Sequence, residues 1–210
     1  MILADVHAQA IQECENASAL IMTTNIFYDN HVTYEETLYS ASIHHCVING
    51  AFLKLFMAFE RFLECSFICY MLGQVGLNGT AVLKYVAPTT DTHALDLLKG
   101  TNHHADFTNR DTIIKLSKNF FENDGPYTAL NGISVAFEEM KKIRNAISHV
   151  SLESEQAFLS LARSKLGSLP PEINTAIFLN TVIAGTSSTY FVYYKGIIES
   201  AINSIANPTP

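Results

Sequence analysis

The fold class of this chain is decided by the stretch Phe52-Leu53-Lys54-Leu55-Phe56-Met57-Ala58-Phe59-Glu60-Arg61-Phe62-Leu63. Its aromatic and aliphatic residues recur every three to four positions, which is the spacing of one face of an α-helix. The same period continues on both sides of the stretch. We therefore expect either two helices or one bent helix from Tyr34 to Leu72, with a weak point at Asn49-Gly50, where a glycine follows a turn-forming residue.

The helical period also recurs in most of the remaining sequence. Helices are expected over Ala4–Phe27, Tyr127–His149, Ser151–Leu166 and Ile173–Ala206, the last with a kink at Gly185–Ser188. No alternating strand pattern competes with them, so the prediction is an all-α fold, an antiparallel helical bundle.

The segment between these helices, from Thr80 to Asp111, has a less regular pattern. A helix is expected to start at Asp91, and Asp111 is placed to cap another that ends at Phe121. The tripeptide Asp124-Gly125-Pro126 predicts a break in the chain.

Bulk composition limits the kind of protein this can be. The 210 residues are expected to form a single domain over positions 1–210, and 48% of them are hydrophobic, enough for a sizeable core. Charged residues make up only 16%, which suggests that a partner covers part of the surface. A net charge of -7 argues against a broadly basic nucleic-acid-binding surface, although a local positive site remains compatible with it.

The first residues and the cysteines bear on location. Met1-Ile2-Leu3-Ala4-Asp5 lacks the basic start and long apolar run of a signal peptide, so a cytoplasmic protein with reduced cysteines is expected. The longest apolar stretch, Phe62 to Leu72, is too short to span a bilayer, and no membrane association is expected.

The main candidate site is the motif Arg144-Asn145-x-x-x-His149. Arginine offers a permanent cation with a planar fork of donors that suits phosphate, and histidine exchanges protons near neutral pH. Residues five apart lie about 140° apart around a regular helix. Arg144 and His149 can therefore converge only from the edges of a shared groove or if the helix ends between them, with Ala146 and Ile147 facing the core. A structural alternative is that both are helix C-terminal cations favoured by the helix dipole.

This motif at the end of a long helix resembles the HEPN superfamily, which includes ribonuclease toxins and nucleases of anti-phage defence. Met57–Gly73 is similar to the first helix of the branch called RiboL-PSP-HEPN. Ile143–Ser151, with Phe158 and Pro170-Pro171, is similar to its C-terminal half. The resemblance covers roughly residues 52–179, so residues 1–50 form an N-terminal helical extension and the final helix is also additional.

The resemblance implies a function and roles for three residues. It implies a metal-independent endoribonuclease without cofactor, acting on RNA as a toxin or defence effector that an antitoxin or regulatory partner restrains. His149 would act as general base or acid, Arg144 would stabilise charge on the phosphate, and Asn145 would orient either of them. Family members commonly dimerise, so a homodimer with a composite active site is expected.

A few further residues are supporting candidates. Glu60 or Glu64, which lie one helical turn apart, could enter the cleft and hold His149 or Arg144; alternatively, both are solvated or paired with Lys54 and Arg61. Ser148 adjoins His149, but no G-x-S-x-G elbow accompanies it.

Metal-binding and base-stacking patterns are weaker. The pairs His44-His45, followed by Cys46, and His103-His104 lack metal-ligand spacing, and we expect no metal site. The aromatic run from Tyr190 to Tyr194 is expected in the core or a dimer interface. The competing functional hypothesis is a non-catalytic HEPN-fold module that dimerises and binds RNA, a nucleotide or a partner protein. A purely structural helical bundle is the third hypothesis.

Overall fold

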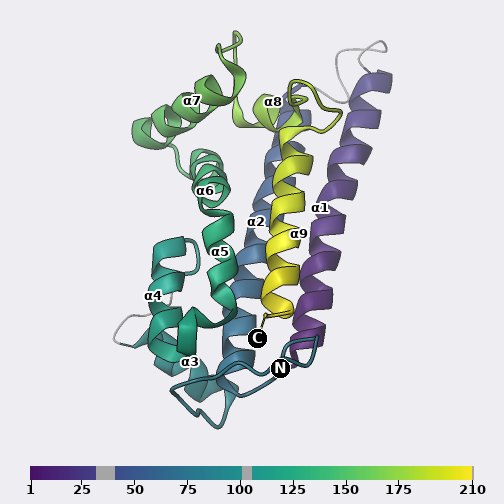
Figure 1. Cartoon of the computed structure of the whole chain (residues 1–210). Coiled ribbons are helices and arrows are strands. Elements are labelled where there is room, and N and C mark those ends of the chain that lie inside the picture. The colour runs from purple at the N-terminus through teal and green to yellow at the C-terminus, as the bar shows by residue number, and fades with distance from the viewer. Residues whose placement is uncertain (32–40, 101–105, 210) are drawn as a thin grey trace. The chain divides into compact units, whose positions relative to one another are not determined.

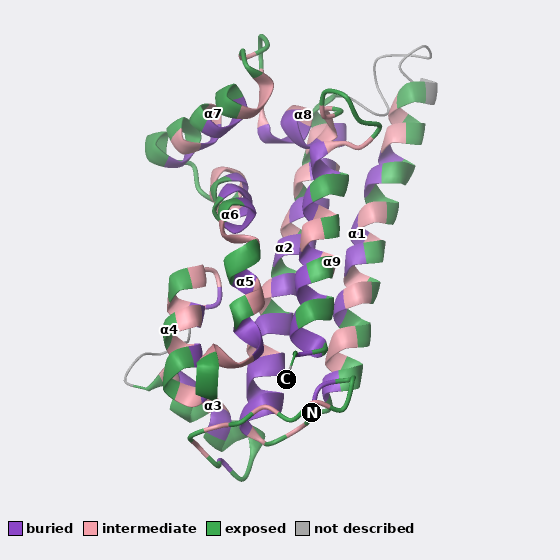
Figure 2. Ribbon diagram, viewed as in Figure 1, coloured by how far each residue is buried: buried purple, intermediate pink, exposed green. Residues whose placement is uncertain are grey.

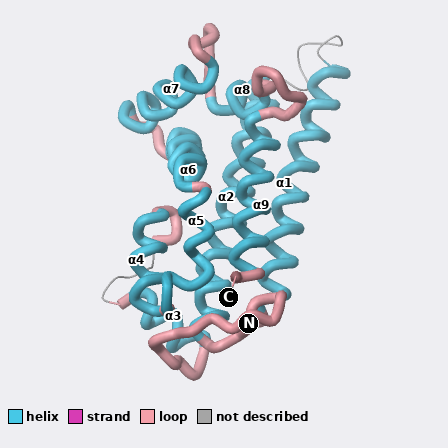
Figure 3. Tube along the Cα trace, viewed as in Figure 1, coloured by secondary structure: helices cyan, strands magenta, loops and turns pink. Residues whose placement is uncertain are grey.

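The computed structural model describes residues 1–31, 41–100 and 106–209. These ranges hold helices and loops, and their only strand-like pairings are the isolated bridges Lys84–Phe121 and Val182–Thr189 (Figures 1 and 3). The α-helices are α1 (Leu3–His31), α2 (Ala41–Met71), α3 (Asp91–Lys99), α4 (Arg110–Phe120), α5 (Ala129–Gly132), α6 (Ser134–Ser148), α7 (Leu152–Leu166), α8 (Thr175–Asn180) and α9 (Tyr190–Ala206), and a 3₁₀ helix, η1 (Glu122–Thr128), precedes α5. The predicted all-α helical bundle is confirmed. The predicted helix start at Tyr34 lies outside the described residues.

The chain packs as two compact units, and each is described by itself. Unit 1 comprises Met1–Gln12, Ala58–Phe137 and Ile197–Pro210. Unit 2 comprises Glu13–Met57 and Glu138–Gly196. The motif from Arg144 to His149 therefore belongs to unit 2.

An aromatic cluster around Phe67 of α2 forms the core of unit 1. The ring centroid of Phe67 lies 4.7 Å from that of Tyr127 and 4.9 Å from that of Phe121, and Phe107 meets it edge-on at 6.0 Å. All four residues are buried. Figure 2 colours the ribbon by burial and shows buried positions along α2. The Tyr127 hydroxyl is satisfied by the Ser66 hydroxyl at 3.0 Å, and burial raises the pKa of Tyr127 well above its usual value. These rings join the segments that precede and follow α4 to α2.

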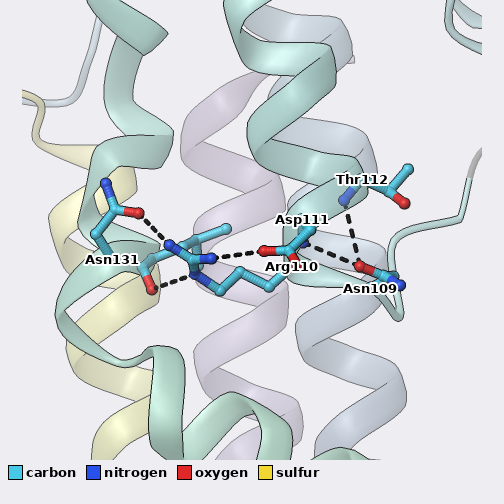
Figure 4. Close-up of polar contacts among 6 residues, drawn as sticks. Asn109, Arg110, Asp111, Thr112 and Asn131 are labelled. Carbon is cyan, nitrogen blue, oxygen red and sulfur yellow. Dashed lines mark hydrogen bonds and ion pairs between the residues drawn. The ribbon is translucent and has the colours of Figure 1, made fainter.

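Helix α4 is capped and anchored by the residues at its start (Figure 4). The Asn109 side chain accepts hydrogen bonds from the backbone N–H groups of Asp111 and Thr112. Arg110 donates to the Leu130 carbonyl at 3.3 Å and to the Asn131 side chain, which ties α4 to α5. The prediction of Asp111 as the N-cap is thus wrong, because the cap is Asn109, two positions earlier. Asp111 lies in the first turn, where its negative charge stabilises the helix N-terminus and its carboxylate pairs with Arg110.

Unit 2 is built on α1 and α2, which run antiparallel there. Glu13 pairs with Lys54 at 3.0 Å near one end, and His44 Nε2 lies 2.8 Å from Asn25 Oδ1 nearer the other. Tyr194 of α9 meets Phe52 of α2 edge-on. Tyr190, Phe191 and Tyr194 are buried, so the core prediction for this aromatic run is confirmed for three of its members, whereas Tyr193 is 40% exposed.

A polar triad with a buried carboxylate and a buried phenol joins three helices of unit 2. Glu139 of α6 pairs with Lys165 of α7 at 2.7 Å, and it accepts a hydrogen bond from the Tyr194 hydroxyl of α9 at 3.1 Å. Glu139 is 8% exposed and Tyr194 is fully buried. Burial, and then the neighbouring carboxylate, raise the pKa of Tyr194, so its hydroxyl stays protonated and donates. The triad therefore fixes α6, the helix that carries the candidate motif.

The structure corrects two expectations about helix continuity: a division of Tyr34–Leu72 into two helices at Asn49-Gly50, and an unbroken helix over Tyr127–His149. Helix α2 continues through Gly50, because the buried neighbours Ile48, Ala51 and Phe52 outweigh the helix penalty of about 1 kcal/mol for one glycine. The expected helix Tyr127–His149 is interrupted at Ile133, which separates α5 from α6 and whose ψ of 13° is not helical.

The expected final helix is divided by more than a kink. Helix α8 ends at Asn180, and α9 begins at Tyr190. In the connecting loop, the Thr186 hydroxyl donates to the Ile183 carbonyl, and Gly185 takes a φ of +78° that favours glycine. Hydroxyl side chains thus give the backbone an alternative to helix.

Candidate functional site

The last two turns of α6 position the motif. Met140 and Ile143 are fully buried and hold one face of the helix against the core of unit 2. Arg144 and Asn145 are half-buried, and the helix ends at Ser148, so that His149 is the first residue beyond it. The backbone N–H of His149 still donates to the Asn145 carbonyl at 2.9 Å. The condition for convergence, a helix that ends between arginine and histidine, is met.

The motif's side chains converge at this helix end. Arg144 Nη1 lies 3.5 Å from His149 Nε2, and it donates to Asn145 Oδ1 at 3.1 Å. A guanidinium can only donate, so this contact suits a histidine that presents the lone pair of Nε2 and carries its proton on Nδ1. At 3.5 Å the contact is long for a hydrogen bond and leaves both groups able to turn to a ligand.

The backbone of His149 is fixed more firmly than its ring. Its carbonyl accepts hydrogen bonds from the Ser154 hydroxyl at 2.9 Å and from the Ser151 N–H at 3.1 Å. Ser151 is also the N-cap of α7 and accepts from the Ser154 N–H at 3.2 Å. The end of one helix and the start of the next are thereby joined through three residues, and the exposed imidazole is held on a short, defined connection.

A pocket of about 390 Å³ opens beside His149. Ala146, Phe158 and Ile173 contribute apolar walls, and Glu155 and Asn174 contribute polar groups. The lining comes from the end of α6, the first turns of α7 and the approach to α8, all in unit 2. Arg144 is not among the lining residues, so the cationic group lies outside the pocket wall.

Two of the residues predicted to support the motif, Ser148 and Glu60, lie in different parts of the structure. Ser148 is exposed in the last turn of α6, and Glu60 is a half-buried residue of α2 in unit 1. Lys54 pairs with Glu13 rather than with Glu60 or Glu64. The expectation that Ala146 and Ile147 face the core is wrong, because both are only half-buried. Ala146 lines the pocket instead.

The histidines considered for metal binding have other contacts. His44 bonds to Asn25 and stacks on Tyr28 at 4.2 Å, while His45 lies 3.4 Å from the Asn174 amide nitrogen. Within residues 1–31, 41–100 and 106–209, no three His, Cys, Asp or Glu side chains cluster in a way that could hold a metal ion. His103 and His104 lie outside the described residues.

Sequence reasoning missed Ser154 and Glu155. Ser151, before a helical pattern, is a recognisable N-cap, and its partner at position 154 could have been found from that signal. The pocket had no comparable signal, because its walls come from three separate segments.

Comparison with known proteins adds no relative: no protein-family model, curated protein or solved structure matches this chain. Among the described residues, no helix combines the length and apolar character needed to cross a membrane.

Proposed function

We propose that this protein is a metal-independent endoribonuclease of the HEPN type, acting as a toxin or anti-phage defence effector. The observation that supports it is the 3.5 Å approach of Arg144 Nη1 to His149 Nε2 at the end of α6. Cleaving an RNA backbone without a metal requires at least a permanently charged cation and a proton-transfer group that both reach one phosphate.

The chemistry assigned to the pair is transfer of the phosphate to the neighbouring ribose oxygen. His149 takes the proton of the 2′-hydroxyl, and the 2′-oxygen attacks phosphorus. The bond to the 5′-oxygen then breaks, and that oxygen leaves with a proton from an acid. Arg144 stabilises the negative charge on the phosphate oxygens, and Asn145 orients the guanidinium through the contact at 3.1 Å. The products are a 2′,3′-cyclic phosphate and a 5′-hydroxyl.

One histidine cannot serve as base and acid in the same turnover step, so a second copy of the motif is proposed to supply the other. Two exposed apolar side chains adjoin His149: Val150, fully exposed, and Leu152, 70% exposed. Burying them against a second copy, or against an antitoxin that blocks the site, would gain apolar contact. Leu152→Asp is expected to weaken self-association, measured by light scattering, while leaving helix content unchanged.

The decisive test is cleavage of single-stranded and structured RNA in the presence of chelator. We expect cleavage by wild type and at least a hundredfold loss in His149→Ala and Arg144→Ala, in line with the roughly 10²–10⁴-fold contribution of a positioned acid or base. Lys142→Ala, an exposed cation on the same helix, is the matched control and is expected to retain activity. Wild-type protein that cleaves no better than His149→Ala would refute the enzymatic proposal.

The second candidate is a non-catalytic HEPN-fold module that binds RNA or a nucleotide. The low charged fraction of 16%, the net charge of -7 and the 48% hydrophobic content favour such a binding module, because an acidic and apolar surface suits a nucleotide or a partner protein better than a long polyanion. In that case Arg144→Ala weakens ligand binding while no variant, and no wild-type preparation, cleaves RNA.

A further inference from the structure

The pocket beside His149 has a chemical character that differs from that of the Arg144 side. Its volume of about 390 Å³ falls within the range of small-molecule sites, about 300–1,000 Å³. Its lining residues include Phe158, which is buried, together with Leu159 and Ile173. A flat, largely apolar group would be accommodated there, as single-stranded RNA bases are when they are splayed out against aromatic and apolar side chains.

The acidic residue that lines this pocket is Glu155, an exposed residue of the first turn of α7. Its carboxylate repels phosphate, and Arg144 lies outside the lining, so the charges favour a phosphate at Arg144 and an uncharged donor group at Glu155. A carboxylate accepts two parallel N–H bonds, as it does from arginine. Among the four RNA bases, guanine alone presents two adjacent N–H donors, N1–H and N2–H, on its Watson–Crick edge.

We infer that this pocket binds the guanine base of a nucleotide next to the scissile phosphate, with Glu155 accepting from N1–H and N2–H. This rests on the proposed ribonuclease function for its biological meaning, although base binding is measurable without cleavage. The ring lies against Phe158, and the phosphate that joins the guanosine to its neighbour reaches His149 and Arg144. The protein therefore cuts RNA beside guanosine.

Two variants separate base recognition from helix stability. Glu153 and Glu155 both lie in the first turn of α7, where their negative charges stabilise the helix N-terminus to the same extent. Only Glu155 lines the pocket. Glu155→Gln and Glu153→Gln therefore remove the same charge from the same turn. Ala146→Leu places a larger side chain at the pocket wall at a helical position that leucine tolerates well.

The first measurement is binding of guanosine, adenosine, cytidine and uridine to the full chain, by saturation-transfer NMR and calorimetry. Wild type and Glu153→Gln should bind guanosine most tightly. Glu155→Gln should lose roughly tenfold to a hundredfold in affinity for guanosine, the expected loss for hydrogen bonds to a charged group. Ala146→Leu should lose binding of all four. Equal affinity for the four nucleosides, or equal loss in the two glutamine variants, overturns the inference.

The second measurement maps cleavage sites on an RNA containing every dinucleotide step. The inference is supported if wild type cuts only at steps that contain guanosine and if Glu155→Gln also cuts at other steps. Cleavage without a guanosine preference overturns it while the ribonuclease proposal stands. Guanosine binding that depends on Glu155, with no cleavage by wild type, sinks the ribonuclease proposal and leaves the base pocket in place.

Discussion

Removing the carboxylate of Glu139 is expected to destabilise unit 2 strongly, although the residue contacts no part of the candidate site. Glu139 is 8% exposed and joins Lys165 at 2.7 Å to the Tyr194 hydroxyl at 3.1 Å. In Glu139→Ala the buried Tyr194 hydroxyl loses its acceptor, which costs about 1–3 kcal/mol. The Lys165 side chain is 27% exposed and can recover water, so its loss is near the value of a surface pair, up to about 1 kcal/mol.

The expected total for Glu139→Ala is about 1–4 kcal/mol. For a chain of this size, a loss of about 3 kcal/mol corresponds to a fall in Tm of roughly 6–12 °C. Thermal and urea unfolding followed by circular dichroism measure it. Glu138→Ala, the exposed neighbour on α6, should change stability by less than about 0.5 kcal/mol.

A double-mutant cycle with Tyr194→Phe isolates the hydrogen bond. In the Tyr194→Phe background no buried hydroxyl is left without an acceptor, so Glu139→Ala should cost about 1–2 kcal/mol less than in wild type. Two results contradict the reasoning: a loss below about 1 kcal/mol in the single variant, or additive effects in the double variant.

Three further outcomes are expected. Burial, and secondarily His45, lower the pKa of His44 below 6.5 against an opposing effect of Asp29, so the unfolded chain binds more protons as the pH falls. The Tm should therefore drop from pH 7 to pH 5, and His44→Gln, which keeps a donor for Asn25, should show a shallower drop; equal slopes would contradict this. Asn109→Ala removes the acceptor for two backbone amides and should cost about 1 kcal/mol in urea unfolding. Phe67→Ala should cost about 3–5 kcal/mol, because a fully buried ring leaves a cavity among aromatic neighbours; a loss under about 1 kcal/mol would show that the cluster collapses freely.

The existence of the helices was predictable because each buries a periodic apolar face. Phe52, Phe56, Phe59 and Phe62 recur at helical spacing, and all four are buried. The boundaries were less predictable, because they depend on contacts from distant segments. Gly50 stays helical since residues on both sides of it enter the core. Ile133 breaks the helix although its side chain fits the apolar stripe, and no local signal beyond the preceding glycine marks the position.

The candidate site was predictable in its chemistry and only partly in its surroundings. Arg144, Asn145 and His149 are close in sequence, so helix geometry alone limits how they can meet. Residues that complete the surroundings are set by tertiary packing: Ile173 and Asn174 line the pocket from more than twenty positions away. Glu60, which the resemblance offered as support, belongs to the other compact unit.

The end of α6 is what turns a weak sequence motif into a chemically useful arrangement. On a continuing helix, the side chains of Arg144 and His149 would lie about 140° apart around the axis and would point to different neighbours. The helix ends at Ser148, and although the His149 N–H still completes a helical hydrogen bond to the Asn145 carbonyl, the bonds from Ser154 and Ser151 to the His149 carbonyl turn the chain away from the helix path at this residue. The interpretation of both residues as helix-terminal cations explains why charge is tolerated there, but it does not require the two side chains to meet. Their approach to 3.5 Å, beside a pocket that Glu155 also lines, is the feature that a dipole effect alone leaves unexplained.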